Sequence, residues 1–264
     1  MPRGLGDVAH FFLPEGGEAV ERRRSSMTSP RRDRPAALPI LALPIGARDV
    51  VRAAFAWNLT VEIARLGASA TLLAPFDADL AALWPESGSG PVGAEIVQTK
   101  ARDLIELGRD ALDVAVARAA ETDEPGVVVV RVPPDWLYGE SAGPHLVRWM
   151  LLLSTDDPRD LAETYALAKR LFALEEGARV GVTIHGVRRV DDARRAFERL
   201  SRVTTRYLGR APRSYGLLVD DLHVYRAIVS RRPIGLEHPQ SPAARALRDV
   251  AELILEDAQV SAIA

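Results

Sequence analysis

The sequence predicts an α/β fold, in which a mostly parallel sheet carries helices on both faces. Three observations predict it. Short apolar runs alternate with longer segments of helical periodicity along most of the chain. One run, Val127–Val130, consists only of valine, which is typical of a central parallel strand covered on both faces. Hydrophobic residues make up 47% of the 264 residues, enough for one sizeable core.

Strands are expected where apolar runs are bounded by glycine, proline or polar residues. The first run, Leu38–Leu43, precedes a loop through Gly46, and the second, 70–74, follows Gly67. The later runs share this length and apolar character: 127–132, 149–154, 179–184 and 215–218. Residues 84–92 are rich in Pro, Gly and Ser, so we expect a loop there.

Helices are expected where apolar residues recur every three or four positions. The first, 50–66, ends before Gly67. Pro158 suits the first turn of the helix at 157–174, because the N–H that proline lacks has no helical partner there. The other segments with this spacing are 100–120, 191–208, 221–229 and 241–258.

The chain is expected to divide into one folded domain and two tails. Residues 1–36 are expected to form a disordered N-terminal tail, 37–260 the α/β domain and 261–264 a short C-terminal tail. Arg22–Arg34 holds six arginines among Ser and Pro, a composition that builds no core.

Residues 6–13 differ from the rest of the N-terminal tail because they are partly apolar. Such a segment is a candidate docking motif for a partner protein. Its anchors are Val8, Phe11, Phe12 and Leu13. The alternatives are an ordinary tail and translation that starts at Met27 instead of Met1.

Composition excludes several classes of site. Without cysteine, the chain has no disulfides, thiolate metal sites or cysteine nucleophiles. A net charge of −2 provides no global field for nucleic acid, so no nucleic-acid partner is expected. No apolar run approaches the ~20 residues of a membrane span, and a cytoplasmic location is expected. Residues 246–264 hold four acidic residues against one arginine, so strong membrane binding is not expected either.

Several stretches in the second half of the chain stand in the order and spacing of one known family. Residues 151–169 and 179–200 each read as a strand followed by an amphipathic helix. Further short motifs lie at 216–221, 231–233 and 239–243. Together they resemble the MinD/ParA family of P-loop ATPases, and within it the FlhG-like branch, which regulates the number and placement of flagella. The resemblance implies a three-layer P-loop NTPase-like fold.

The resemblance places the family's P-loop at Gly46–Ala53. A P-loop wraps phosphates with backbone N–H groups of glycines, reaches them with a lysine and holds Mg²⁺ with a Ser or Thr hydroxyl. Aligned with the family's GKGGVGKT, only Gly46 and Val50 match here. Side chains replace glycines at three positions: Arg48, Asp49 and Val51.

The residues that carry the chemistry in the family also differ here. Ala47 replaces the lysine that reaches across the dimer, Arg52 the P-loop lysine and Ala53 the Mg²⁺ ligand. Arg131 stands where the family has the acidic residue that ends its Walker B strand. His185 replaces the asparagine that contacts adenine.

These replacements predict a degenerate nucleotide site. ATP and Mg²⁺ are not expected to bind, so no cofactor is expected, and no catalytic residue is assigned. Two other interpretations remain open. Arg48, Arg52 and Arg131 form a basic pocket for another anion, or they only pair with Asp49 or Asp77.

The expected function is that of a non-catalytic MinD/ParA/FlhG-like regulator or scaffold. It acts through contacts with unidentified proteins, in positioning flagella or another polar structure, and its dimerisation does not depend on nucleotide. The alternative is a nucleotide-dependent ATPase switch with a non-standard P-loop.

A remote alternative is a serine hydrolase. Gly139–Gly143 matches the G-x-S-x-G elbow, with Ser141 as nucleophile. The elbow needs a strand directly before it and a long helix after it, but Pro133–Tyr138 intervenes and few residues follow. The base would come from one of three histidines: His145, His223 or His238.

Overall fold

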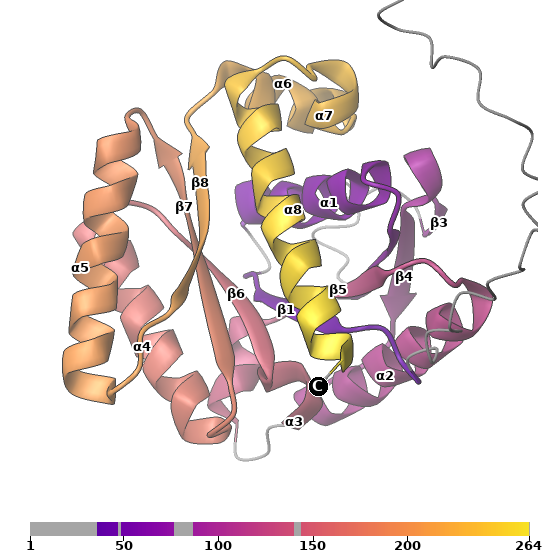
Figure 1. Ribbon diagram of the computed structural model, residues 1–264, viewed down its shortest axis with the longest axis horizontal. Helices are drawn as coiled ribbons and strands as arrows, with labels where there is room; N and C mark the ends of the chain where they lie inside the picture. Colours follow the sequence, from indigo (N-terminus) through magenta and orange to yellow (C-terminus); the bar gives the residue numbers. More distant parts are fainter. Residues whose placement is uncertain (1–35, 47–48, 77–86, 140–143, 264) are drawn as a thin grey trace, which may run out of the picture. The chain divides into compact units, whose positions relative to one another are not determined.

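The computed structural model describes residues 36–46, 49–76, 87–139 and 144–263. The chain divides into two units, Met1–Asp33 and Arg34–Ala264, and the described residues belong to the second (Figure 1). Residues 1–35 of the predicted N-terminal tail, with the docking motif, therefore lie outside the described residues.

The described residues form one eight-stranded sheet in the order β3-β4-β2-β5-β1-β6-β7-β8. Its strands are β1 (Ile40–Pro44), β2 (Ser69–Pro75), β3 (Gly88–Ser89), β4 (Glu95–Thr99), β5 (Gly126–Val132), β6 (Trp149–Ser154), β7 (Arg179–Val187) and β8 (Arg213–Val219). All neighbouring pairs are parallel except β3 with β4. The expected fold class, with a mostly parallel sheet, is confirmed.

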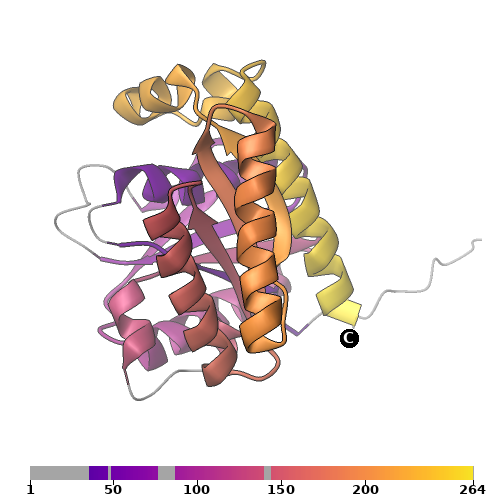
Figure 2. The same cartoon turned by 90° about the vertical axis from the view of Figure 1, so that its left-hand side faces the viewer.

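Helices cover both faces of this sheet, which gives three layers (Figures 1 and 2). They are α1 (Val50–Arg65), α2 (Leu104–Glu121), α3 (Pro144–Val147), α4 (Pro158–Leu174), α5 (Val190–Leu208), α6 (Leu222–Ser230), α7 (Ile234–Glu237) and α8 (Pro242–Ile263), with short 3₁₀ turns at Pro91–Gly93 and Pro134–Tyr138. One core lies under α1, α7 and α8, and the other under α2, α4 and α5. Alternate residues of β1 feed the two cores: Leu41 and Leu43 enter the first, Ala42 the second.

Two strands at one side of the sheet were not expected from the sequence. β3, at the edge, has only two residues, both exposed, and β4, between β3 and β2, has only Ile96 and Val97 as apolar residues. Strands this close to the edge of a sheet bury little, so their apolar signal is weak. β7 also runs three residues beyond the expected Ile184, past Gly186, whose φ of 69° accompanies an irregular register with β8.

The topology opens a crevice at the carboxyl ends of β1 and β6. These strands are neighbours, yet α1 and α4, which follow them, pack into opposite cores. In open parallel sheets, ligands bind at such a point, because the two following helices diverge and leave the strand ends uncovered. We therefore expect a functional site at the carboxyl ends of β1 and β6.

Candidate functional site

The two helices that border the crevice begin at capping carboxylates. Asp49 caps α1 and accepts a hydrogen bond from the N–H of Arg52 at 2.9 Å. Asp157 caps α4 and accepts from the N–H of Arg159 at 2.8 Å. Because each carboxylate satisfies an N–H group that has no partner within the helix, the local sequence fixes where each helix starts.

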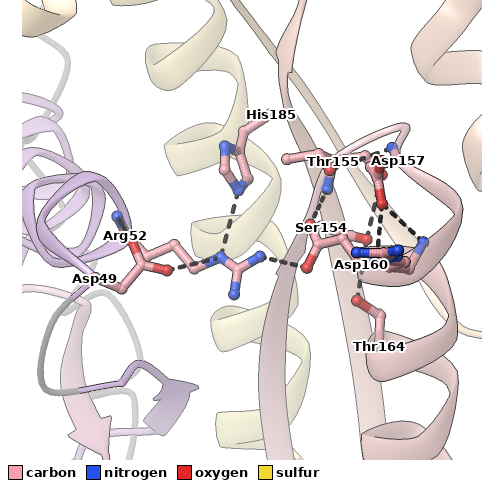
Figure 3. A network of polar contacts seen from close by, with 9 residues as sticks. Asp49, Arg52, Ser154, Thr155, Asp157, Asp160, Thr164 and His185 are labelled. Atoms are coloured by element: carbon pink, nitrogen blue, oxygen red, sulfur yellow. Dashed lines mark hydrogen bonds and ion pairs between the residues drawn. The ribbon is translucent and has the colours of Figure 1, made fainter.

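Arg52 bridges the crevice between the two helices (Figure 3). Its Nε lies 3.3 Å from Asp49 Oδ2, and one terminal nitrogen donates to Asp160 Oδ1 at 2.6 Å. The Nε also donates to His185 Nε2 at 3.4 Å. The Arg52 side chain is 23% exposed and that of Asp160 is 17% exposed. Partial withdrawal from water strengthens such a pair relative to a surface ion pair. Arg52 thus joins α1, α4 and β7.

Asp160 is held from two directions. Its Oδ2 accepts from the backbone N–H of Thr155 at 2.5 Å, while its Oδ1 accepts from Arg52. Burial raises the pKa of Asp160, but the hydrogen bonds from Arg52 and Thr155 and the Arg52 charge outweigh burial and lower the pKa overall. Asp160 is therefore a fixed anion at neutral pH.

His185 is the neutral member of this group, which we call the Arg52 network (Asp49, Arg52, Asp160 and His185). Burial lowers the pKa of His185, and the neighbouring Arg52 charge lowers it further, against smaller opposing effects of Asp160 and Asp49. A neutral imidazole has one nitrogen free to accept, which matches the hydrogen bond that Nε2 accepts from Arg52.

The other predicted P-loop positions lie around the start of α1. Val50 is the first residue of α1, Val51 is 37% exposed, and Ala53 is buried with no hydroxyl to offer a metal. Gly46 accepts from the N–H of Asp49 at 3.2 Å. Ala47 and Arg48, and with them part of the predicted anion pocket, lie outside the described residues, as does Asp77.

Arg131 lies on β5, paired with Leu43 of β1, and is 2% exposed. Its Nε donates to the carbonyl of Ile45 at 3.5 Å. The buried side chain therefore contacts the start of the loop that leads to α1.

A pocket of about 350 Å³ opens beside the Arg52 network. Its lining includes Asp49, Arg52 and His185, and continues to Asp220 and Asp221 at the end of β8. Sequence reasoning gave no site role to Asp160, Asp220 or Asp221. A usable signal existed, because each of them follows the carboxyl end of a predicted parallel strand, the edge where ligands bind.

The described part of the chain holds no group of three or more His, Asp or Glu residues placed to bind a metal ion. None of the helices described is both long and apolar enough to cross a membrane.

The elements around the G-x-S-x-G segment do not form a nucleophile elbow. A 3₁₀ turn, Pro134–Tyr138, precedes it where a strand is needed, and α3, which follows it, has four residues. Ser141 itself lies outside the described residues.

Comparison with solved structures identifies the fold. The chain resembles MinD in the MinC:MinD cell division complex of Aquifex aeolicus, with a TM-score of 0.59 and 12% identity, over 83% of this chain and 96% of that one. It also resembles MinD of Pyrococcus horikoshii complexed with Mg-ADP, with a TM-score of 0.57 and 13% identity, over 84% of this chain and 98% of that one. The sequence matches no family model and no curated protein.

The expectation that the site takes no ATP and no Mg²⁺ is wrong on this comparison, because the P. horikoshii protein of the same fold was solved with Mg-ADP. The physical reason is that the expectation rested on side chains alone. A helix that starts at a strand end also offers backbone N–H groups and its dipole to phosphate, and a comparison of side chains does not report these groups.

The expected exclusion of nucleic acid is not supported either. The pNOB8 ParA structure, bound to nonspecific DNA, matches with a TM-score of 0.50 and 10% identity, over 82% of this chain and 99% of that one. The MinC:MinD complex, in turn, makes protein partners plausible for this fold. At these low identities the likeness establishes architecture: the chain has the fold of the MinD/ParA P-loop ATPases.

Proposed function

We propose that this chain is a regulator of the MinD/ParA type that acts through protein contacts and does not hydrolyse ATP. The Arg52 bridge carries the proposal, since Asp49 and Asp160 hold one guanidinium from two sides of the crevice. In a P-loop ATPase, the cation at this position stabilises the charge on the β- and γ-phosphates. A guanidinium whose charge is already paired with two carboxylates has less of that charge to offer a phosphate.

Two further residues support the absence of catalysis. P-loop enzymes hold Mg²⁺ with a hydroxyl on the first turn of this helix and an acidic residue on a neighbouring strand. Here Ala53 has no hydroxyl. Near the end of β5, where the resemblance places the acidic residue, the chain has the buried Arg131 instead. The proposal concerns turnover only. A nucleotide held by backbone N–H groups without hydrolysis is compatible with it.

Phosphate release from Mg-ATP tests the proposal. We expect the wild-type chain to release phosphate no faster than buffer. Arg52→Ala removes the bridge, and Arg248→Ala, on the exposed side of α8, is the matched control. Release that scales with protein concentration, persists in Arg248→Ala and disappears in Arg52→Ala would contradict the proposal.

The second candidate is a nucleotide-dependent switch with a non-standard P-loop, and the Mg-ADP complex of the P. horikoshii structure favours it. Light scattering with and without Mg-ATP separates the two. A regulator that does not cycle keeps one oligomeric state. A doubling of mass on addition of Mg-ATP would favour the switch, because a ligand shifts an equilibrium only through a difference in affinity between states.

The process is proposed from sequence resemblance. The stretches at 151–169, 179–200, 216–221, 231–233 and 239–243 resemble the MinD/ParA family and within it the FlhG-like branch, which favours positioning of flagella or another polar structure. The docking motif at residues 6–13 is the proposed contact for a protein partner. Deletion of residues 1–36, followed by capture of partners from native lysate, tests that contact. Recovery of the same partners at the same yield would assign binding to the folded domain instead.

A further inference from the structure

The pocket beside the Arg52 network has an apolar body of a size suited to a small molecule. Its volume is about 350 Å³, within the range of ligand sites. Side chains from α1, α6 and α8 and from the ends of β6 and β8 line it. The main apolar ones are Phe55, Leu153, Leu218, Val224, Ile234 and Leu247.

One side of this pocket carries two carboxylates that form no ion pair with a described residue. Asp221 caps α6 and accepts backbone N–H bonds, from His223 at 2.9 Å and from Ala243, at the start of α8, at 3.2 Å. Asp220 is exposed and accepts from the Tyr225 hydroxyl at 3.5 Å. These donors carry no formal charge, so both carboxylates keep theirs at the pocket.

The charge balance of the described lining is therefore negative. It contains three carboxylates, those of Asp49, Asp220 and Asp221, against the single guanidinium of Arg52. Arg52 is bound to Asp49 and to Asp160, so it does not neutralise the other two carboxylates. A cleft with charge of one sign and low-dielectric walls concentrates ligands of the opposite sign.

We propose that this pocket binds a small organic cation, an ammonium or guanidinium group on an apolar body. The cationic head lies against Asp220 and Asp221, and the body lies among the apolar side chains. Tyr225 lines the same side, and its aromatic ring is a second group that attracts cations. The inference rests on the proposed function, because the bound cation would set the state of a regulator that does not cycle with ATP.

Three indole derivatives that share one body and differ in head group test the proposal. Tryptamine is a cation, tryptophol is neutral and indole-3-propionate is an anion at neutral pH. Calorimetric titration of the full chain is expected to give a Kd for tryptamine at least about tenfold below the Kd for tryptophol, and no measurable binding of indole-3-propionate. Raising NaCl from about 50 to about 500 mM should weaken the binding of tryptamine and leave the binding of tryptophol unchanged. Equal affinities, or preference for the anion, would overturn the proposal.

Variants assign the binding to the pocket. Asp220→Asn removes one charge from an exposed residue that makes a single side-chain contact, and should raise the Kd of tryptamine about fivefold. Ala54→Leu extends a half-buried lining residue into the pocket and should weaken tryptamine and tryptophol together. Asp249→Asn, exposed on α8 outside the pocket, is the matched charge control and should change nothing. A control that weakens binding as much as Asp220→Asn would place the cation elsewhere.

A capped Leu-Arg-Leu peptide distinguishes a free amine from a partner's side chain. If the peptide binds more tightly than tryptamine, the occupant is a side chain of a partner protein and the small-molecule assignment is wrong. The experiments distinguish a failure of the cation-binding proposal from a failure of the proposed function. Loss of amine selectivity with no phosphate release refutes this inference alone, while selective amine binding by a chain that hydrolyses ATP refutes the proposed function.

Discussion

Two polar networks tie helices to the sheet in this protein, and their surroundings differ. The Arg52 network spans a crevice at the carboxyl ends of the strands and borders a pocket. On the α8 face, the Tyr215 hydroxyl accepts from Trp149 Nε1 at 2.9 Å and donates to Asp257, which also pairs with Arg213. Trp149 and Tyr215 are each 2% exposed. We call this second group the Tyr215 network.

The comparison separates polar groups that only stabilise the fold from polar groups whose charge can change with pH. Burial raises the pKa of Tyr215, and the hydrogen bond to Asp257 raises it further, so the hydroxyl stays protonated at any physiological pH. The Tyr215 network thus joins β6, β8 and α8 as a fixed connection. The Arg52 network includes a histidine and lies next to Asp220 and Asp221, which form no ion pair with a described residue, so we expect it to respond to pH. Four substitutions test this contrast.

The largest effect is expected from Asp257→Asn. The Asp257 side chain is 9% exposed and accepts the hydroxyl of Tyr215, so its loss weakens a charge-assisted hydrogen bond inside the core. The free energy of unfolding should fall by about 2–3 kcal/mol, measured by urea denaturation. Asp249→Asn, an exposed position on the same helix, should leave it nearly unchanged. Equal effects of the two variants would show that the Tyr215 network does not stabilise the fold.

Gly181→Ala tests how closely the sheet packs around Tyr215. An added Cβ would lie 2.1 Å from Tyr215 Cε2, so either the ring or β7 must move. The free energy of unfolding should fall by about 2 kcal/mol, as in other overpacked cores. Gly177→Ala is the control, because its Cβ would meet only the flexible Glu175 side chain, at 3.2 Å. A shift no larger than that of the control would mean that the ring moves without cost.

The sequence predicted the layers of the fold because apolar periodicity reports burial directly. The predicted strand at 127–132 corresponds to β5, which begins one residue earlier, and the predicted strand at 149–154 has the same bounds as β6. β3 and β4 were missed because β3, at the edge, and β4, next to it, have few buried apolar residues. α2 begins at Leu104 and not at Lys100, because Asp103 is the capping residue and its side chain accepts from the N–H groups of Ile105 and Glu106.

The site was less predictable because its contacts join distant parts of the chain. The family resemblance identified Arg52 and His185 as site positions, but only the fold places Asp160 beside Arg52, 108 residues away in the sequence. No local pattern reports such a contact. Asp220 and Asp221 were likewise visible as residues after a strand, yet only the packing of α6 and α8 places them on a pocket.

Arg52→Met tests the anchoring of Asp160, with an effect of about 1–2 kcal/mol on unfolding at pH 7, since the pair is partly exposed. The pKa of Asp160 lies below its ordinary value, so its contribution is present above the unfolded pKa and is lost as pH falls through the folded pKa. In Arg52→Met, burial dominates and the pKa of Asp160 should rise, measured by carboxyl NMR titration. The stability difference between the two proteins should shrink as pH falls through the pKa of Asp160 in the variant towards the lower pKa in wild type. A difference that stays constant with pH would exclude an electrostatic origin.

The smallest effect is expected from His185, and it isolates the response of the Arg52 network to pH. Burial and then the Arg52 charge lower the pKa of His185 in the folded protein, so the unfolded chain takes up a proton first as pH falls. Its contribution to stability is therefore present above the unfolded pKa of about 6.5 and is lost as pH falls towards the folded pKa.

Urea denaturation of wild type and His185→Gln at a series of pH values from about 7.5 to about 5 measures this loss. The glutamine keeps an acceptor within reach of Arg52 but does not titrate. We expect wild-type stability to decline relative to His185→Gln by less than about 1.4 kcal/mol per pH unit, the limit for one proton. In the Arg52→Met background the decline should be smaller, because one of the two causes of the lowered pKa is gone. Parallel profiles for wild type and His185→Gln would show that His185 does not sense pH, and the Arg52 network would then resemble the Tyr215 network as a fixed structural connection.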